Sequence, residues 1–360
     1  MRRSERHVAL LLAAICAVCL TGCATKNDTR TFSGPIGGVT FRYPSSLTPK
    51  GGIHKLGGDN WLQVFTGAQG VSVEVTFLPT RTGLDPLDGI GVSLRVSSPL
   101  GLTSSKPTSS GVVRATRFLR VGDIVAVSRD YDFTSSDSRA MRKTDVAVPL
   151  ATGTLVVQAT APPDSWLQAQ AMQLGILRSL KLAAPQPAAV SLVTYNGEYG
   201  FSLTLPAAFK QVWTAPRQAG PWRLMRFHGF DASGRMTTAI DFAWTPNILP
   251  SAAQPQSPAI WRRWAAYISR YTLGAMDSKA LVQHLQQVDD RQQAWHWQYL
   301  LPTKRVHAVY YAESAGNRMT MVFGYVTGHE WFLRQELLEA IGMSLIDNTA
   351  SSSTASPSPQ

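Results

Sequence analysis

The residues best suited to bind a ligand are aromatic, and most of them lie in the second half of the chain. Eight of the ten tryptophans follow residue 200. Trp295 and Trp297 are two positions apart, so on a strand they would share one face. Trp261 and Trp264 would likewise share one face of a helix. Aromatic rings stack on sugars, peptides and lipid chains but also fill cores, so these four residues are candidate ligand contacts, with core packing as the alternative.

The known patterns of catalytic and metal sites are incomplete in this sequence. The stretch from Gly91 to Arg95 lacks the final glycine of a nucleophile elbow. His329 and Glu330 begin a zincin-like motif, but Leu333 stands where the second histidine is needed. We therefore expect no catalytic residue, no metal ligand and no cofactor. A hydrolase of cell-wall or lipid substrates, with catalytic residues supplied by loops such as residues 80–110, is the alternative.

All three cysteines lie close to the amino terminus, at Cys16, Cys19 and Cys23. No thiol follows Cys23, so the remainder of the chain can form no disulfide framework, cysteine-ligated zinc site or iron–sulfur cluster. A domain without disulfides must be held together by its hydrophobic core.

The first 22 residues have the pattern of a secretory signal. Arg2, Arg3 and Arg6 precede an apolar run over residues 8–20. That run is shorter than the roughly 20 residues that a helix needs to cross a bilayer, and a small-residue exit follows it. A charged start, a short apolar centre and such an exit predict export rather than a transmembrane span.

The exit reads Leu20, Thr21, Gly22, Cys23, which resembles the lipobox of bacterial lipoproteins. The resemblance implies acylation of the Cys23 thiol, cleavage of residues 1–22 and membrane lipid as a partner. Ala24 at the following position implies sorting to the outer membrane, facing the periplasm. Residues 23–31 would then form a tether between the bilayer and the folded part.

The chain carries a formal net charge of +11, which is spread over both halves. Because no basic stripe is interleaved with aromatic residues, and because we expect export, nucleic acid is not an expected partner. A spread positive charge can be a solvated surface, or it can attract anionic lipid head groups and envelope polymers. Arg223 and Arg226 are candidate contacts for such an anionic group. An envelope protein complex is a further possible partner.

Two diverged copies of one pattern organise the chain. Residues 38–47 and 200–209 both read glycine, apolar, hydroxyl, apolar, polar, apolar, proline, two small residues, apolar. The alternation predicts a strand with one buried face, and Pro44 or Pro206 ends it. Later, residues 154–159 and 319–324 predict strands that precede Trp166 and Trp331. Each tryptophan begins an apolar pattern with helical spacing that closes on Ser-Leu.

Between these matches the halves differ. Residues 80–110 are rich in glycine, proline and serine and predict a long loop, whereas residues 257–287 predict a helix. Residues 183–190 predict a short linker. Residues 348–360 contain serine, threonine, alanine and proline without charge, which predicts a disordered tail.

The strand that ends at Tyr43-Pro44, the antiparallel strands and the final helix that ends in Ser-Leu resemble the PsbP-like α/β/α sandwich. The resemblance implies an α+β fold with two tandem diverged domains, at residues 32–182 and 191–347, each an antiparallel sheet with a carboxy-terminal amphipathic helix. It also implies a non-catalytic binding or accessory role in the cell envelope, although fold alone does not determine function.

Overall fold

The computed structural model describes residues 28–79, 86–98, 111–122, 124–182, 191–197, 201–230, 234–244, 281–287, 292–300, 305–315, 318–327 and 331–347. Within these ranges the chain is an α+β protein made mostly of antiparallel sheets with a few helices. The expected signal, the lipobox with Cys23, the linker over 183–190, Trp261, Trp264 and the tail over 348–360 lie outside the described residues. In the described part, no helix is both long and apolar enough to span a bilayer.

The first half contains a small and a large antiparallel sheet. The small sheet has the order β1-β2-β11, and the large sheet has the order β3-β5-β6-β10-β9-β8-β7, with β4 paired to β5. The strands are β1 (Thr29–Ser33), β2 (Val39–Pro44), β3 (Thr48–Pro49), β4 (His54–Gly57), β5 (Asn60–Thr66), β6 (Ser72–Pro79), β7 (Gly111–Val121), β8 (Ile124–Thr134), β9 (Ala140–Leu150), β10 (Gly153–Ala161) and β11 (Lys181–Leu182).

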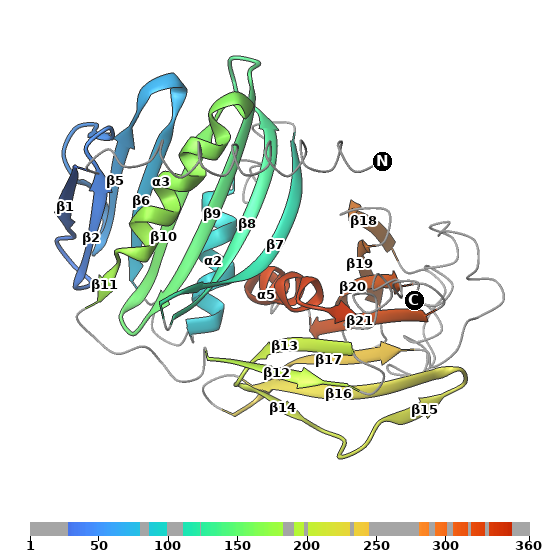
Figure 1. Ribbon diagram of the computed structural model, residues 1–360. Helices are drawn as coiled ribbons and strands as arrows, with labels where there is room; N and C mark the ends of the chain where they lie inside the picture. The colour runs from blue at the N-terminus through green and yellow to red at the C-terminus, as the bar shows by residue number, and fades with distance from the viewer. Residues whose placement is uncertain are drawn as a thin grey trace, which may run out of the picture.

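Helices cover both faces of the large sheet (Figure 1). Helix α3 (Trp166–Arg178) follows the short 3-10 turn η2 (Pro163–Ser165) and packs on β10, β6 and β2. Its buried Ala169, Met172 and Ile176 belong to the core of the first half. On the opposite face, helix α2 (Pro86–Ser97) packs on β9 and β10. A second 3-10 turn, η1 (Ala68–Gly70), joins β5 to β6.

The described strands of the second half repeat this order. The small sheet runs β12-β13-β22 and the large sheet runs β14-β16-β17-β21-β20-β19-β18, with β15 paired to β16. Helix α5 (Trp331–Met343) packs on this sheet as α3 does on the first. The strands are β12 (Leu192–Asn196), β13 (Phe201–Pro206), β14 (Phe209–Gln211), β15 (Arg217–Ala219), β16 (Trp222–Phe230), β17 (Met236–Trp244), β18 (Leu281–Gln287), β19 (Gln292–Leu300), β20 (Arg305–Ala315), β21 (Arg318–Thr327) and β22 (Ile346–Asp347).

The serine of each Ser-Leu pair forms equivalent hydrogen bonds to a strand of its own half. The Ser179 hydroxyl accepts the backbone N–H of Arg42 at 2.8 Å and donates to the Arg42 carbonyl at 3.0 Å. The Ser344 hydroxyl does the same at Thr204, at 2.9 and 3.0 Å. Each serine therefore joins the end of its helix to the strand that the repeated proline motif predicted, β2 or β13.

Two sequence predictions about the inserts were wrong. Within residues 80–110, which predicted a loop, residues 86–97 form helix α2. The buried side chains of Leu87, Ile90 and Leu94 have helical spacing, and Pro86 fits the first helical turn. The helical spacing of these three residues is hard to recognise in the sequence because glycine, proline and serine surround them. In the second insert, residues 281–287 form β18 rather than helix, because their backbone pairs with β19.

One hydrophobic core contains residues of both halves, in addition to the separate core of the first half. Leu87, Ile90 and Leu94 of α2 belong to the same buried cluster as Leu337 and Ile341 of α5. Figure 1 shows α5 between the first sheet and the second, beside α2 and β7. The close approach depends on Gly91, where an added Cβ would lie 2.2 Å from the Leu333 carbonyl oxygen. The halves therefore pack as one body through α2 and α5.

Candidate functional site

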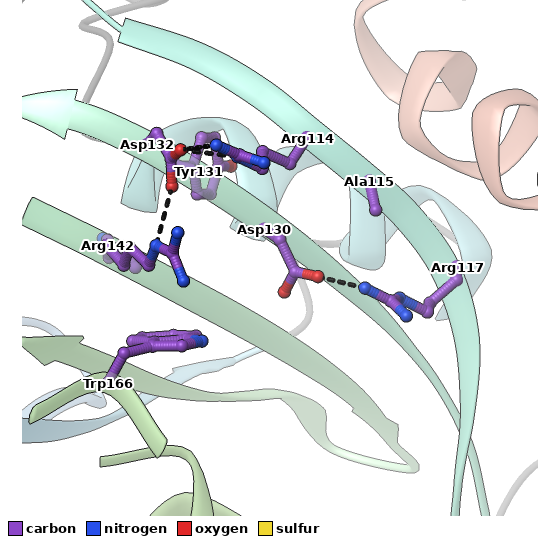
Figure 2. Close-up of a pocket in the computed structure, with 9 residues that line it drawn as sticks. Arg114, Ala115, Arg117, Asp130, Tyr131, Asp132, Arg142 and Trp166 are labelled. Atoms are coloured by element: carbon purple, nitrogen blue, oxygen red, sulfur yellow. Dashed lines mark hydrogen bonds and ion pairs between the residues drawn. The ribbon is translucent and has the colours of Figure 1, made fainter. Parts of the chain in front are cut away.

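A charged pocket lies on the outer face of the first sheet, over β7, β8 and β9 and beside the first turn of α3 (Figure 2). Strand alternation creates it. Arg129 and Tyr131 of β8 are buried, whereas Asp130 and Asp132 alternate with them and therefore face the other side of the sheet, into the pocket. The pocket has a volume of about 260 Å³.

Three arginines surround these two aspartates. Arg114 of β7 forms an ion pair with Asp132, which also lies 3.4 Å from the Nε of Arg142 on β9. Arg117 of β7 forms an ion pair with Asp130. The Thr144 hydroxyl donates to the other oxygen of Asp130 at 2.6 Å. The five charged side chains thus carry one more positive than negative charge; we call them, with Trp166, the arginine pocket.

The arginines are more exposed than their partners. The exposed fractions of the Arg114 and Arg117 side chains are 60% and 57%, against 32% for Asp132 and 19% for Asp130. A molecule that approaches from solvent therefore meets guanidinium groups first. Because guanidinium binds carboxylate and phosphate in bidentate geometry, the pocket is suited to an anionic group.

Trp166 supplies an apolar wall where α3 begins, on the β9 side of the pocket (Figure 2). A second hollow of about 320 Å³ continues past Asp132 and Arg142 toward Pro163. Val112 is exposed and pairs with Asp132 in the sheet register, so it lies close to this second hollow. The site therefore combines cationic groups with a ring on which a sugar or an apolar chain can pack.

The described residues contain no group of three or more histidine, cysteine, aspartate or glutamate side chains that could hold a metal ion. The arginine pocket contains no histidine or cysteine either. The charged side chains of the pocket are suited to binding a charged group.

The arginines that the sequence singled out lie elsewhere, on β16. Arg226 forms a bidentate ion pair with buried Asp241, at 2.7 and 2.9 Å. The guanidinium groups of Arg226 and Arg217 also lie over the Trp213 ring, 4.8 and 4.6 Å from its centroid. Arg223 lies three positions from Arg226 in a regular stretch of strand, so their side chains leave opposite faces of the sheet.

The four candidate tryptophans are only partly placed. Trp295 and Trp297 lie in β19, opposite Tyr310 and Ala308 of β20, and two positions apart in a regular register. That register matches the strand on which they were expected to share a face. Trp261, Trp264 and the lipobox residues Leu20, Thr21, Gly22 and Cys23 lie outside the described residues.

The arginine pocket itself was not found from the sequence. One signal was available, because Asp130 and Asp132 alternate with apolar positions on a predicted strand. Their partners on β7 and β9 depend on the register of three strands, and a single sequence does not give that register.

Comparisons with known proteins give a limited result. No protein-family model matches the chain, and no curated protein sequence matches it. Among solved structures, the chain is similar to cyanobacterial PsbP (CyanoP) from Synechocystis sp. PCC 6803, with a TM-score of 0.32 and 12% identity over 46% of this chain and 97% of that one. It is also similar to LpqN of Mycobacterium tuberculosis, described as involved in cell envelope biogenesis, with a TM-score of 0.26 and 11% identity over 44% of this chain and 91% of that one.

A third similar structure is the immunity protein TplEi of the type VI secretion system of Pseudomonas aeruginosa. It has a TM-score of 0.22 and 11% identity over 89% of this chain and 97% of that one. All three scores are too low to support a conclusion about family or function. The functional argument therefore rests on the chain's own residues.

Proposed function

We propose that this protein is a lipid-anchored, non-catalytic binding module of the bacterial cell envelope, and that the arginine pocket binds an anionic group of an envelope component. The observation that carries the proposal is the set of three arginines around two partly covered aspartates, with Trp166 beside them. The shared chemistry of the ligand is a carboxylate or phosphate attached to a sugar or an apolar portion.

The anchor part of the proposal is supported by the lipobox and the short apolar signal that precedes it. Two or more acyl chains hold a protein stably at a bilayer, because each buried CH₂ contributes about 0.8 kcal/mol. Ala24 supports sorting to the outer membrane. A pocket presented beside a membrane would meet anionic lipids and polymers at high local concentration.

The fold part of the proposal is that the chain is a tandem pair of diverged PsbP-like α/β/α sandwiches, at residues 32–182 and 191–347. The identical strand order of the two large sheets supports it. So do the equivalent hydrogen bonds of Ser179 and Ser344. After a duplication, one copy can acquire a function that the other lacks. The charged residues of the arginine pocket all belong to the first domain.

Binding can be tested with full-length protein in nanodiscs of zwitterionic lipid. The two probes are soluble peptidoglycan fragments, which carry carboxylates, and glycerol 3-phosphate. We expect one of them to raise the unfolding temperature in a saturable way. The Arg114→Gln/Arg142→Gln variant should bind at least about tenfold more weakly, because each lost charge-assisted hydrogen bond contributes roughly 1.5–3 kcal/mol.

Arg139→Gln is the matched control, because Arg139 is also an exposed arginine in an ion pair, with Asp137. It should bind as the wild type does. Equal binding by all three proteins, or no response to either probe, would remove the arginine pocket from the proposal.

The anchor is tested separately by mass spectrometry of the mature amino terminus. We expect a diacylglyceryl group on Cys23 and a precursor that accumulates with globomycin. A Cys23→Ser chain that is still processed identically and found in the same membrane fraction would contradict the anchor.

The hydrolase alternative draws its catalytic residues from loops such as residues 80–110. Two polar side chains in the described part of that segment are engaged in packing: Asp88 forms a 2.8 Å ion pair with Arg334, and the Ser97 hydroxyl donates to Asp145 at 3.0 Å. Turnover of the peptidoglycan fragments by wild-type protein would support the alternative.

A further inference from the structure

A third pocket, of about 340 Å³, lies where the edge strand β7 meets the small sheet of the second half. It exists only because the two halves pack together, since neither half supplies all of its walls. The end of α5 completes it. The residues used in the argument are Phe118, Arg120, Leu192, Thr194, Thr204 and Met343.

One side of this junction pocket is cationic and polar. Arg120 is exposed and forms no ion pair with any residue that the structure describes. The Thr194 and Thr204 hydroxyls lie 3.4 Å apart on the facing sheet and can donate to an anion. No aspartate or glutamate is among the lining residues, so no acidic side chain of the walls would repel a bound anion.

The other side is apolar. Phe118 and Met343 are partly buried against the core shared by the two halves, and half-buried Leu192 of β12 lines the same pocket. Met343 is held in place because its sulfur accepts the backbone N–H of Thr116 at 3.1 Å. Apolar atoms of a ligand that covered these side chains would be removed from water at about 25 cal/mol per Å².

We propose that the junction pocket binds an anionic amphiphile, a molecule with one alkyl chain that ends in a phosphate or carboxylate. Arg120 and the threonine hydroxyls hold the anionic end, and Phe118, Leu192 and Met343 pack on the chain. The site is separate from the arginine pocket, although Arg117 borders both. Because both halves contribute walls, the bound amphiphile stabilises their packing.

Three small probes distinguish binding of the anionic group from binding of the alkyl chain. Hexyl phosphate carries both parts, inorganic phosphate only the anion, and 1-hexanol only the chain. Full-length protein in zwitterionic nanodiscs is titrated with each, and empty nanodiscs are subtracted. We expect hexyl phosphate to bind at one site, at least about tenfold more tightly than either other probe, since its anion and six carbons both contribute.

Two variants test the location without disturbing the core. Arg120→Gln removes the positive charge and should weaken hexyl phosphate binding about tenfold or more. Thr194→Trp, at an exposed strand position, should fill the pocket and abolish binding. Arg42→Gln, an exposed strand arginine outside the pocket, should leave binding unchanged.

Unchanged binding in both Arg120→Gln and Thr194→Trp would overturn the proposal, as would hexanol binding as tightly as hexyl phosphate. Loss of binding in Arg114→Gln/Arg142→Gln with full binding in Arg120→Gln would assign the amphiphile to the arginine pocket instead and would also overturn it.

Discussion

The guanidinium of Arg129, on β8 of the first half, donates to the carboxylate of Glu336, on α5 of the second half, at 2.8 Å, and both side chains are buried. A second carboxylate of the same helix, Glu339, lies 3.1 Å from Arg129 and accepts the Thr116 hydroxyl at 2.8 Å. Burial lowers the pKa of Arg129, but Glu339, Tyr131 and Glu336 together outweigh burial and raise it. The junction between the halves is therefore ionic at its centre as well as apolar.

Arg129→Met should strongly destabilise the protein. It leaves Glu336 and Glu339 buried without their shared cation, and breaking a buried ion pair from one side typically costs about 3–5 kcal/mol. Urea unfolding followed by tryptophan fluorescence measures the loss. Arg139→Met removes an exposed ion pair and should cost no more than about 1 kcal/mol. Similar losses in the two variants would show that the junction does not depend on Arg129.

Substitution by alanine should change the stability of the protein in opposite directions at two helical glycines. Gly91 of α2 has no room for a Cβ, because the Leu333 carbonyl oxygen would lie 2.2 Å away. Gly175 of α3 has nothing within 4 Å of the same position. Alanine favours helix over glycine by about 1 kcal/mol, so Gly175→Ala should stabilise the protein, whereas Gly91→Ala should destabilise it by forcing α2 and α5 apart. Thermal unfolding of both variants measures this, and a stabilising Gly91→Ala would contradict the close helix contact.

The elements that repeat in the sequence were predictable, and those that depend on long-range contacts were not. The paired proline motifs coincide with β2 and β13, and the patterns that begin at Trp166 and Trp331 coincide with α3 and α5. Each of these signals is local, because alternation and helical spacing record which face of an element is buried.

The functional surfaces needed information that a local pattern does not contain. Arg129 and Glu336 are 207 positions apart, and nothing near either residue in the sequence indicates the other. The sequence predicts a loop at α2 because glycine and serine are typical of loops, whereas Gly91 is the residue that allows the close contact with α5. The arginine pocket likewise depends on how β7, β8 and β9 are aligned.

Removing either repeated serine should have a similar effect. Ser179→Ala would leave the backbone N–H and carbonyl of Arg42 without their partner, and Ser344→Ala would do so at Thr204. The hydrogen bonds at Arg42 are exposed and those at Thr204 are partly buried, so each serine should contribute the net value of an ordinary hydrogen bond, about 0.5–1.5 kcal/mol. Chemical denaturation of the two variants and their double mutant measures the losses, which should add because the sites lie in different halves. Losses within error of zero would mean that water replaces the hydroxyl.

Arg226 should be essential for stability in its own half. Burial raises the pKa of Asp241, and the bidentate contact with Arg226 opposes that rise. Arg226→Met leaves the buried carboxylate unpaired and should cost about 3 kcal/mol or more. Arg226→Met/Asp241→Leu, which removes both charges, should recover much of that loss. Equal stability of the single variant and the wild type in denaturant would show that the ion pair is replaceable by solvent.

The buried carboxyl of Asp145 should make stability fall as pH rises through the weakly acidic range. Burial raises its pKa to about 6, although Lys143 at 3.1 Å and the Ser97 hydroxyl at 3.0 Å oppose the rise. The folded state therefore favours the protonated form, and the stability that this carboxyl contributes is complete below about pH 4 and is lost by about pH 6. A pKa difference of about two units corresponds to roughly 3 kcal/mol.

The measurement is the difference in unfolding free energy between wild type and Asp145→Asn, taken at intervals from pH 4 to pH 7. We expect the wild type to lose up to roughly 3 kcal/mol relative to the variant across that range. Asp137→Asn is the control with opposite sign, because the Ser135 hydroxyl and Arg139 lower the pKa of this exposed carboxyl. Relative to that variant, the wild type should gain stability as pH rises through the acidic range. A difference for Asp145→Asn that does not change with pH would mean that Lys143 and Ser97 fully compensate the burial of Asp145.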